Sequence, residues 1–373
     1  MRAVRLALLL AAAPVAALAG CAALEPVPGF EVPPERWRAA VARRGVDPAE
    51  VPNPMEATPA MRVAARGLGG AGGDVERLEH LRNALLDGTT FMFEYERSST
   101  FSAAETYEQR RGNCVSFTNL FIALGRSLGI RLQAALVGAR GESEKKGDLI
   151  VSYNHMVAVH PFGAGTSVRV YDFYRTGEES GGRLVLLGDL AVAAIRASNL
   201  GIEHLGRGQP AEALRDLETA VKLEPGLGSL HANLGLARWR AGDVPGAFAA
   251  LARGLDVDPA SPPLHQNLAA LYVEQGRPAE ARAALAALDV SRASPYALLV
   301  RGDLDLMAGD AAKAIASYRK AARLDPKLAE PWVGIARAEL ARGRPEASRK
   351  AAQKALARDP RNEVARPLAD APR

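Results

Sequence analysis

The sequence predicts two parts of different fold class, an α+β domain followed by an all-α solenoid of helical repeats. Between residues 114 and 174, apolar spacing indicates the order helix, strand, strand, strand. From about residue 190 the chain becomes rich in Ala, Leu, Glu and Arg with helical spacing, and glycine recurs at intervals of 33 or 34 residues. A chain of 373 residues is also longer than one compact core usually holds.

The first twenty residues have the pattern of a targeting signal. Arg2 and Arg5 form a short basic region, residues 6–18 are apolar, and Leu18-Ala19-Gly20-Cys21 follows. This run resembles the lipobox of bacterial lipoproteins, which implies that residues 1–20 are a signal peptide and that Cys21 is acylated. The alternative is an ordinary secretory signal that is cleaved near Ala19.

The lipobox resemblance also implies a location. Residue 22 is alanine rather than aspartate, which implies sorting to the outer membrane of a bacterial cell envelope, facing the periplasm. The lipid on Cys21 is then the contact with the membrane, because no later segment is long and apolar enough to span one. Residues 21–57 are rich in Pro, and we expect a tether with one short helix near residues 35–44.

Residues 58–189 are expected to form the α+β domain. Helical spacing over 75–86 and alternation over 89–95 predict a helix and a strand. Ser102 and Glu105 have capping-box spacing, so a short helix starts at residue 103 and ends before residue 112. The next helix begins at Cys114 and ends near residue 129, and its single apolar stripe contains Phe117, Leu120, Phe121, Leu124 and Leu128.

Three strands complete the predicted domain. Residues 132–137 have the pattern of a buried strand, and 141–147 that of a charged loop. The next strand spans 149–160 and stops at Pro161, with His155 on one face and His160 on the other. The last strand covers 168–174 and contains Asp172, and the connections are short enough for antiparallel hairpins.

Cys114 has the features of a nucleophile. A thiol at a helix N-terminus faces unpaired backbone N–H groups and the positive end of the helix dipole, and both favour the thiolate. If Cys21 carries lipid, Cys114 has no partner for an internal disulfide, since the chain contains only these two cysteines. The alternative is a buried and inert cysteine.

His155 and Asp172 complete a candidate triad with Cys114. If their strands pair, the imidazole and the carboxylate are cross-strand neighbours on one face, and the helix start brings the thiol to the same edge. The histidine then takes and returns the thiol proton, and the carboxylate fixes the tautomer of the ring. Taken singly, a hydrogen-bonded core histidine and a strand-end carboxylate are the alternatives.

Residues 102–174 resemble the transglutaminase-like cysteine fold, which is papain-like. The matching pieces are Ala104-Glu105, Arg111-Gly112-Asn113-Cys114, Asn119-Leu120-Phe121-Ile122-Ala123-Leu124, Leu128-Gly129-Ile130, Asn154-His155-Met156-Val157 and Val170-Tyr171-Asp172. The resemblance implies that Cys114 is the nucleophile, His155 the acid and base, and Asp172 the orienting residue, with an acyl intermediate that passes to water or to an amine. Two positions depart from the family pattern, because many relatives have an aromatic residue at Val157 and proline at Phe173.

Residues 190–373 repeat with one period. Glycines, prolines and small residues keep this period at Gly208, Gly242, Gly276, Gly309 and Gly343, at Pro225, Pro259, Pro326 and Pro360, and at Ala213, Ala247, Ala281, Ala314 and Ser348. The pattern resembles five tetratricopeptide repeats. The resemblance implies helix pairs that stack into a superhelix with a concave groove.

The repeats are expected to bind a protein or a peptide. Asn199, Asn233 and Asn267 recur at intervals of 34 on the first helices of three successive repeats, and an asparagine ladder can hold a peptide backbone. Trp239 adds a contact surface. The alternative for the asparagines is a polar bond between helices, or simple exposure.

Composition narrows the remaining classes. The formal net charge is +5 and no basic patch with aromatics is evident, so we expect no nucleic-acid partner. The histidines lack metal-ligand spacing, and neither metal nor cofactor is expected. The sequence therefore predicts a lipid-anchored envelope protein that hydrolyses amide or isopeptide bonds, or transfers their acyl group to an amine. The alternative is a catalytically silent scaffold that assembles an envelope complex.

Overall fold

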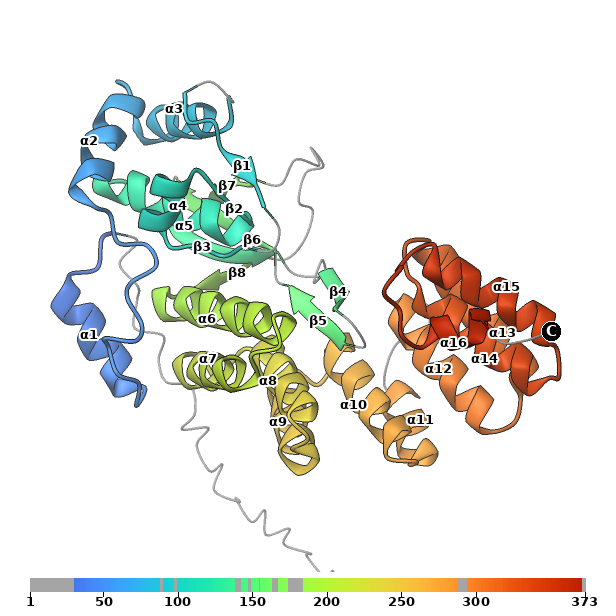
Figure 1. Ribbon diagram of the computed structural model, residues 1–373. Coiled ribbons are helices and arrows are strands. Elements are labelled where there is room, and N and C mark those ends of the chain that lie inside the picture. The colour runs from blue at the N-terminus through green and yellow to red at the C-terminus, as the bar shows by residue number, and fades with distance from the viewer. Residues whose placement is uncertain are drawn as a thin grey trace, which may run out of the picture.

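The computed structural model describes residues 30–87, 90–96, 99–137, 142–146, 149–153, 155–162, 167–173, 184–286 and 294–370. The expected signal peptide, residues 1–20, and Cys21 lie outside the described residues. Figure 1 shows an α+β part followed by stacked helix pairs, so the predicted fold class is confirmed. No helix within the described ranges is long and apolar enough to cross a membrane.

Among the described residues, all strands lie before residue 188, and only helices follow. The α+β part contains, in chain order, α1 (Pro34–Arg43), α2 (Pro59–Leu68), α3 (Asp74–Leu86), β1 (Glu94–Tyr95), α4 (Ala103–Gln109), β2 (Arg111–Gly112), α5 (Cys114–Ser127), β3 (Gln133–Val137), β4 (Glu142–Lys146), β5 (Leu149–Tyr153), β6 (Met156–Phe162), β7 (Ser167–Tyr171) and β8 (Leu184–Leu187). The helical part contains α6 (Asp189–Gly206), α7 (Pro210–Leu223), α8 (Gly228–Arg240), α9 (Val244–Val257), α10 (Pro262–Glu274), α11 (Pro278–Ala286), α12 (Pro295–Met307), α13 (Ala311–Leu324), α14 (Glu330–Ala341), α15 (Pro345–Leu356) and α16 (Ala365–Asp370).

The α5 helix is central to the α+β part. Every residue from Val115 to Arg126 is buried, so this helix is covered on all sides rather than along the single stripe that the sequence predicted. It contacts β3 and β6 of a four-stranded sheet with the order β7-β6-β3-β8, in which all neighbours are antiparallel. Helices α2, α3 and α4 also pack on α5 (Figure 1), which closes the core around it.

The strand predicted over 149–160 is in fact two strands. β5 pairs with β4 in a separate hairpin, so residues 142–146 form a strand where a charged loop was expected. β6 runs through Pro161 to residue 162 instead of stopping before the proline. The pairing of β6 with β3 ends at Val159, so the N–H that Pro161 lacks is not needed there. The last predicted strand ends at Tyr171, and the predicted strand over 89–95 is reduced to β1.

Much of the expected tether over residues 21–57 is packed against the protein. The short helix predicted near 35–44 is present as α1, and Trp37 is buried with Val41, Val46 and Val51 in a cluster that includes residues of α6 and α7. The Trp37 indole N–H donates a hydrogen bond of 2.8 Å to the Val51 carbonyl. The apolar residues of this segment are too sparse for a periodic pattern. They nevertheless fix the segment to the helices of the first repeat, so it is not a free linker.

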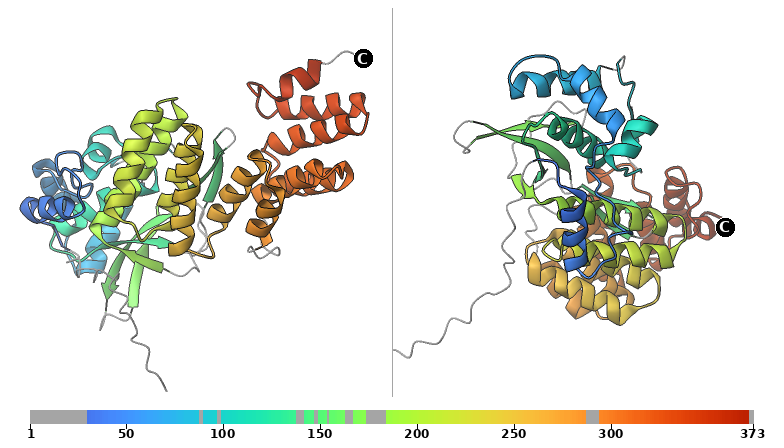
Figure 2. Two further views of the ribbon diagram at one scale, coloured as in Figure 1. Left: turned by 90° about the horizontal axis from the view of Figure 1, so that it is seen from below. Right: turned by 90° about the vertical axis from the view of Figure 1, so that its left-hand side faces the viewer.

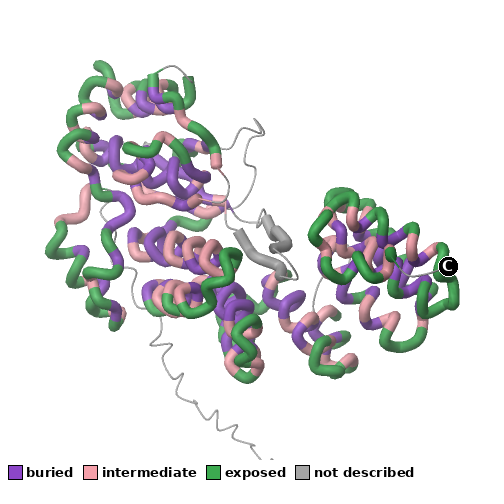
Figure 3. Tube along the Cα trace, viewed as in Figure 1, coloured by how far each residue is buried: buried purple, intermediate pink, exposed green. Residues whose placement is uncertain are grey.

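The helix pairs have the small residues where the period requires them. The glycines that separate the helices of the pairs, from Gly208 to Gly343, have φ between +67° and +80°, the left-handed conformation that glycine adopts without strain. The recurring small residues of the second helices, from Ala213 to Ser348, are fully buried where the helices meet. Figure 3 shows these buried positions between the helices and the exposed positions outside.

The α6 helix belongs to both parts of the molecule. Ala191, Val192 and Ile195 lie in the core around α5, whereas Ala193 and Ala194 pack with α1 and α7. In Figure 2 the following helix pairs extend from this helix away from the sheet. The first repeat is therefore built into the α+β part.

Candidate active site

Cys114 is the first residue of α5, and the residues before it shape the helix start. The Asn113 side-chain oxygen caps the helix by accepting hydrogen bonds from the N–H groups of Val115 (3.1 Å) and Ser116 (3.2 Å). Gly112 has a φ of +145°, and a Cβ there would lie 2.5 Å from the Cβ of Ser116. The residues Gly-Asn-Cys therefore fit this entry, and the helix start predicted at Cys114 is confirmed.

Strands β6 and β7 bring His155 and Asp172 together. Ala158 pairs with Tyr171, so His155, just before β6, lies diagonally across from Asp172, just after β7. His155 Nε2 and Asp172 Oδ2 are 2.9 Å apart. The two side chains are 15% and 27% exposed, so the pair is partly buried but still open to solvent.

Cys114 also acts on the pKa of His155, through hydrogen bonding and electrostatic attraction. Because Asp172 occupies Nε2, the nitrogen that remains for the sulfur is Nδ1. Burial lowers the pKa of the imidazole, but hydrogen bonds to Asp172 and Cys114, together with electrostatic attraction by both, raise the pKa of His155 to about 10. The ring is therefore protonated at neutral pH, which suits a thiolate partner.

Two contacts fix the strands of the site to the helix of the sulfur. Thr118 of α5 donates a hydrogen bond of 3.2 Å to the carbonyl of Met156, the residue after His155. Phe173, the residue after Asp172, stacks on Phe117 with ring centroids 5.4 Å apart and meets Phe121 edge-on at 5.1 Å. Phe173, which departs from the family pattern, therefore anchors the end of β7 to α5.

The start of α5 also offers a donor for an oxyanion. The N–H groups of Val115 and Ser116 are taken by Asn113, whereas no acceptor among the described residues bonds to the N–H of Cys114. A backbone N–H at the first residue of a helix points along the dipole, toward the space in front of the helix. The geometry therefore leaves one preorganised donor beside the sulfur.

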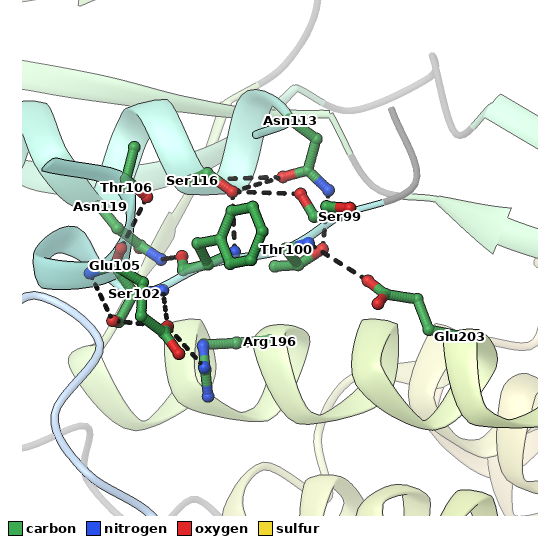
Figure 4. A network of polar contacts seen from close by, with 11 residues as sticks. Ser99, Thr100, Ser102, Glu105, Thr106, Asn113, Ser116, Asn119, Arg196 and Glu203 are labelled. Atoms are coloured by element: carbon green, nitrogen blue, oxygen red, sulfur yellow. Dashed lines mark hydrogen bonds and ion pairs between the residues drawn. The ribbon is translucent and has the colours of Figure 1, made fainter. Parts of the chain in front are cut away.

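A network of polar contacts lies behind this helix start and connects it to α6 (Figure 4). Thr100 accepts a hydrogen bond from Asn113 Nδ2 at 2.7 Å, and its own N–H donates to Glu203 of α6 at 3.2 Å. Arg196 of α6 pairs with Glu105 of α4 at 2.9 Å. The residues that position the sulfur are thus in contact with the first repeat helix.

The three asparagines of the predicted ladder do not line an open groove. Asn199 Nδ2 donates to Thr100 Oγ1 at 3.1 Å, so it contacts the α+β part. Asn233 is 2% exposed and donates to Ser198 Oγ at 3.0 Å, which fits the alternative of a bond between helices. Asn267 is also 2% exposed. The β5 strand lies against α8 and α10 (Figure 1), so this part of the solenoid is covered by the chain itself.

Trp239 is likewise part of the packing between repeats. It is half-buried and lies against Ile202, Leu205 and Leu236. The contact surface expected from its sequence position is therefore only partly available.

The last two repeats contain a basic cluster that was not predicted from the sequence. It consists of Arg319 and Arg323 of α13 and Lys350 and Lys354 of α15, around Trp332 of α14, and these residues line a cavity of about 390 Å³. Lys354 Nζ lies 4.4 Å from the centroid of the Trp332 ring. The cations come from two helices and the indole from a third, so no single run of sequence reveals the cluster.

Two further residues were missed, and they join the two parts of the molecule. Arg126 of α5 forms a two-pronged ion pair with Asp189 of α6, with N–O distances of 2.7 and 3.0 Å. The side chains are 1% and 7% exposed. They are 63 residues apart, and the only signal in the sequence was that Arg126 is the one charged residue of this helix.

Three further histidines form hydrogen bonds with backbone carbonyls. His160 Nδ1 bonds the carbonyl of Arg131 at 2.8 Å, and His231 and His265 bond the carbonyls of the prolines six residues before them. Within the described ranges, no group of three or more His, Cys, Asp or Glu side chains is arranged to hold a metal ion.

Comparison with known families agrees with the order of the two parts. A model of the transglutaminase-like superfamily matches residues 62–175, and tetratricopeptide-repeat models match 198–262, 238–301 and 305–370. The chain carries a transglutaminase-like domain followed by tetratricopeptide repeats. The transglutaminase-like and the tetratricopeptide-repeat resemblances are thereby confirmed, and repeats of this kind indicate that a protein or a peptide is bound. Among curated proteins, no match is found.

Solved structures similar to this chain match it over slightly less than half its length. Cut9–Hcn1 of the APC/C hetero-tetramer is 17% identical with a TM-score of 0.44, over 47% of this chain and 35% of that chain. A thermophilic tetratricopeptide-repeat protein of Thermus thermophilus is 22% identical with a TM-score of 0.42, over 46% and 95%. PilW, a type IV pilus biogenesis factor, is 17% identical with a TM-score of 0.40, over 44% and 77%.

Proposed function

We propose that this protein is a cysteine hydrolase of amide or isopeptide bonds, held at the bacterial outer membrane by lipid on Cys21 and facing the periplasm. The observation that supports this most directly is the 2.9 Å contact between His155 and Asp172, in which Cys114 also helps to raise the pKa of the His155 ring. The match of residues 62–175 to the transglutaminase-like superfamily supports cysteine chemistry at this place.

The proposed acylation step follows from the charges of the pair. The Cys114 thiolate attacks the carbonyl carbon, a C–S bond forms, and the C=O electron pair moves to oxygen, where the N–H of Cys114 donates a hydrogen bond. The oxyanion then collapses, the C–N bond breaks, and the His155 imidazolium gives its proton to the departing amine. The products are a thioester on Cys114 and a neutral imidazole that Asp172 keeps oriented.

Deacylation reverses the role of His155. The neutral ring takes a proton from water as the water oxygen attacks the thioester carbon, and collapse breaks the C–S bond and restores the thiolate and the imidazolium. An amine in place of water would give transfer. Hydrolysis is the preferred outcome because water is abundant and the site is open to solvent.

The experiment that tests this function starts from a substrate-independent acyl donor. We expect 4-nitrophenyl acetate to add one acetyl group to Cys114, seen by intact mass and peptide mapping, and a panel of fluorogenic amides and isopeptides to be cleaved. Cys114→Ala removes both, with folding checked by circular dichroism. Cleavage retained in Cys114→Ala discards the assignment. If the wild-type protein shows neither acylation nor cleavage, the alternative of a catalytically silent scaffold is favoured.

The membrane anchor has its own test. Cells grown with an alkyne-labelled fatty acid should incorporate the label into the wild-type protein and not into Cys21→Ser, which should appear in the soluble fraction. Label that persists in Cys21→Ser would contradict the anchor.

The partner of the repeats is proposed to be an acidic peptide that docks on the basic cluster. Residues 311–356 contain eleven Lys and Arg against four Asp and Glu. Among the described residues, no carboxylate forms an ion pair with Arg319, Arg323, Lys350 or Lys354. The cavity also contains apolar surface from Trp332, so a segment with carboxylates around one apolar side chain is complementary to it.

A charge reversal tests this docking site. A fluorescein-labelled peptide of alternating Glu and Leu should bind the full-length protein, more weakly as salt rises, and Lys350→Glu with Lys354→Glu should weaken binding at least tenfold. Arg215→Glu with Lys222→Glu makes the same charge change on exposed positions of α7 and should change binding less than twofold. An equal loss in both double variants, or tighter binding of an oligonucleotide than of the peptide, would overturn the proposal.

A further inference from the structure

The hydroxyl of Thr100 joins the catalytic domain to the first repeat. Thr100 Oγ1 accepts two hydrogen bonds, one of 2.7 Å from Asn113 and one of 3.1 Å from Asn199 of α6. Thr100 is 2% exposed and Asn113 is 6% exposed, so the bond between them is shielded from water, whereas the bond from Asn199 is partly buried. A single buried oxygen thus connects the residue that caps the nucleophile helix with a residue of the repeat solenoid.

The contact with Thr100 fixes the orientation of the Asn113 amide. An amide has an acceptor end and a donor end, and only the oxygen can cap the N–H groups of Val115 and Ser116. The donor end of Asn113 bonds to Thr100, which holds the oxygen toward the helix. A rotated amide would turn its NH2 group toward two backbone donors and remove the cap beside Cys114.

Helix α6 holds Thr100 from two positions one turn apart. Asn199 donates to the Thr100 hydroxyl, and the Glu203 carboxylate accepts from the Thr100 N–H at 3.2 Å. Residues four apart on a helix share one face, so the two side chains form a clamp. Figure 4 shows Thr100 between the start of α5 and the Glu203 side chain of α6.

We propose that Asn199 is a positioning residue for the proposed reaction: through Thr100 and Asn113 it keeps the start of α5 in the state that makes Cys114 nucleophilic. Asn199 acts on Cys114 only through Thr100 and Asn113. This proposal rests on the proposed function, but its test measures the thiol directly and needs no substrate.

The test compares alkylation of Cys114 by iodoacetamide in the full-length protein and its variants. At pH 6.5 we expect Asn199→Ala to lower the second-order rate constant about three- to tenfold, the range that corresponds to a lost cap interaction. Thr100→Val, which keeps the shape but not the hydroxyl, should lower it at least as much. Asn233→Ala is the matched control, because Asn233 occupies the same place in the next repeat and bonds Ser198 instead.

The pH dependence separates positioning from general damage. If Asn199 acts by favouring the thiolate, the rate difference should shrink above the ordinary thiol value of about 8.5, where the thiolate forms without help. A rate for Asn199→Ala within twofold of wild type, an equal loss in Asn233→Ala, or a difference that persists at pH 9.5 would overturn the proposal. Slowed alkylation in a protein that cleaves no amide would instead overturn the proposed function alone.

Discussion

The first and the last repeats have the same period but different surroundings. In the first repeat, α6 contributes Ala191, Val192 and Ile195 to the core around α5. In the last two, the core cluster is made within the repeats themselves, from Tyr296 on α12 to Ala352 on α15. One copy of the repeat has become a wall of the transglutaminase-like domain, whereas the last two repeats pack mainly on each other.

This difference shows that a repeat pattern fixes the shape of a unit but not its neighbours. Asn199 and Asn233 occupy equivalent places, yet Asn199 bonds the transglutaminase-like domain and Asn233 bonds the preceding repeat. The role of each copy depends on what lies beyond the end of the solenoid. Variants that act on one end and not on the other can therefore test the separation.

The largest expected effect comes from the buried ion pair at the front of the solenoid. Arg126→Ala leaves Asp189 buried without its guanidinium partner, and we expect the free energy of unfolding to fall by about 3–5 kcal/mol. Because the pair connects α5 to α6, iodoacetamide should also react more slowly with Cys114. Urea denaturation followed by circular dichroism, with alkylation in parallel, measures both.

The control for the front pair lies in the second repeat. Arg238 pairs with Glu218 at 3.1 Å at the surface, so Arg238→Ala should lower the free energy of unfolding by less than about 1 kcal/mol. If Arg126→Ala lowers the free energy of unfolding by no more than Arg238→Ala does, this pair does not fix α6 to the transglutaminase-like domain.

A smaller effect, matched at the two ends, is expected from two helix glycines. A Cβ at Gly201 of α6 would lie 2.7 Å from Leu217 Cγ, and one at Gly302 of α12 would lie 2.4 Å from the ring of Tyr318. Either glycine replaced by alanine should lower the free energy of unfolding by about 1–3 kcal/mol, because the buried neighbours must move. Only Gly201→Ala should also slow the alkylation of Cys114.

Gly206 provides the control for this pair. It lies in α6, and a Cβ there would have nothing within 4 Å, so Gly206→Ala should be neutral or slightly stabilising. Equal alkylation rates in Gly201→Ala and Gly302→Ala would show that packing at the front of the solenoid does not reach the site.

Features of the fold that depend on neighbouring residues could be predicted from the sequence, and contacts between distant elements could not. The start of α5 was predictable because Asn113 and Cys114 stand at a break in the pattern, and the repeats because glycine must recur where φ is positive. The pairing of His155 with Asp172 followed from the expectation that two successive strands pair as a hairpin, although the first of them is shorter than predicted. These signals all lie within one element or between neighbours in the chain.

What the sequence could not reveal depends on contacts between distant elements. Asp189 looks like the first residue of a repeat helix, and nothing near it identifies Arg126 as its partner. The charged run over 141–147 has the composition of a loop, yet its residues 142–146 form a strand that pairs with β5 outside the main sheet. Trp37 similarly has no partner until α6 and α7 are in place.

The smallest expected effect concerns the titration of His155, and it should leave the solenoid unchanged. Hydrogen bonding and attraction by Asp172 and Cys114 favour the charged ring, so its pKa is raised to about 10 despite burial. Asp172→Asn removes one of the two attracting groups, so the titration midpoint of the His155 ring, followed by NMR, should move to lower pH. Asp303→Asn makes the same change beside Tyr318 in the fourth repeat and should leave that midpoint in place. An unchanged midpoint in Asp172→Asn would mean that Asp172 does not help to hold His155 charged. A shift in Asp303→Asn would mean that the two ends of the solenoid are coupled after all.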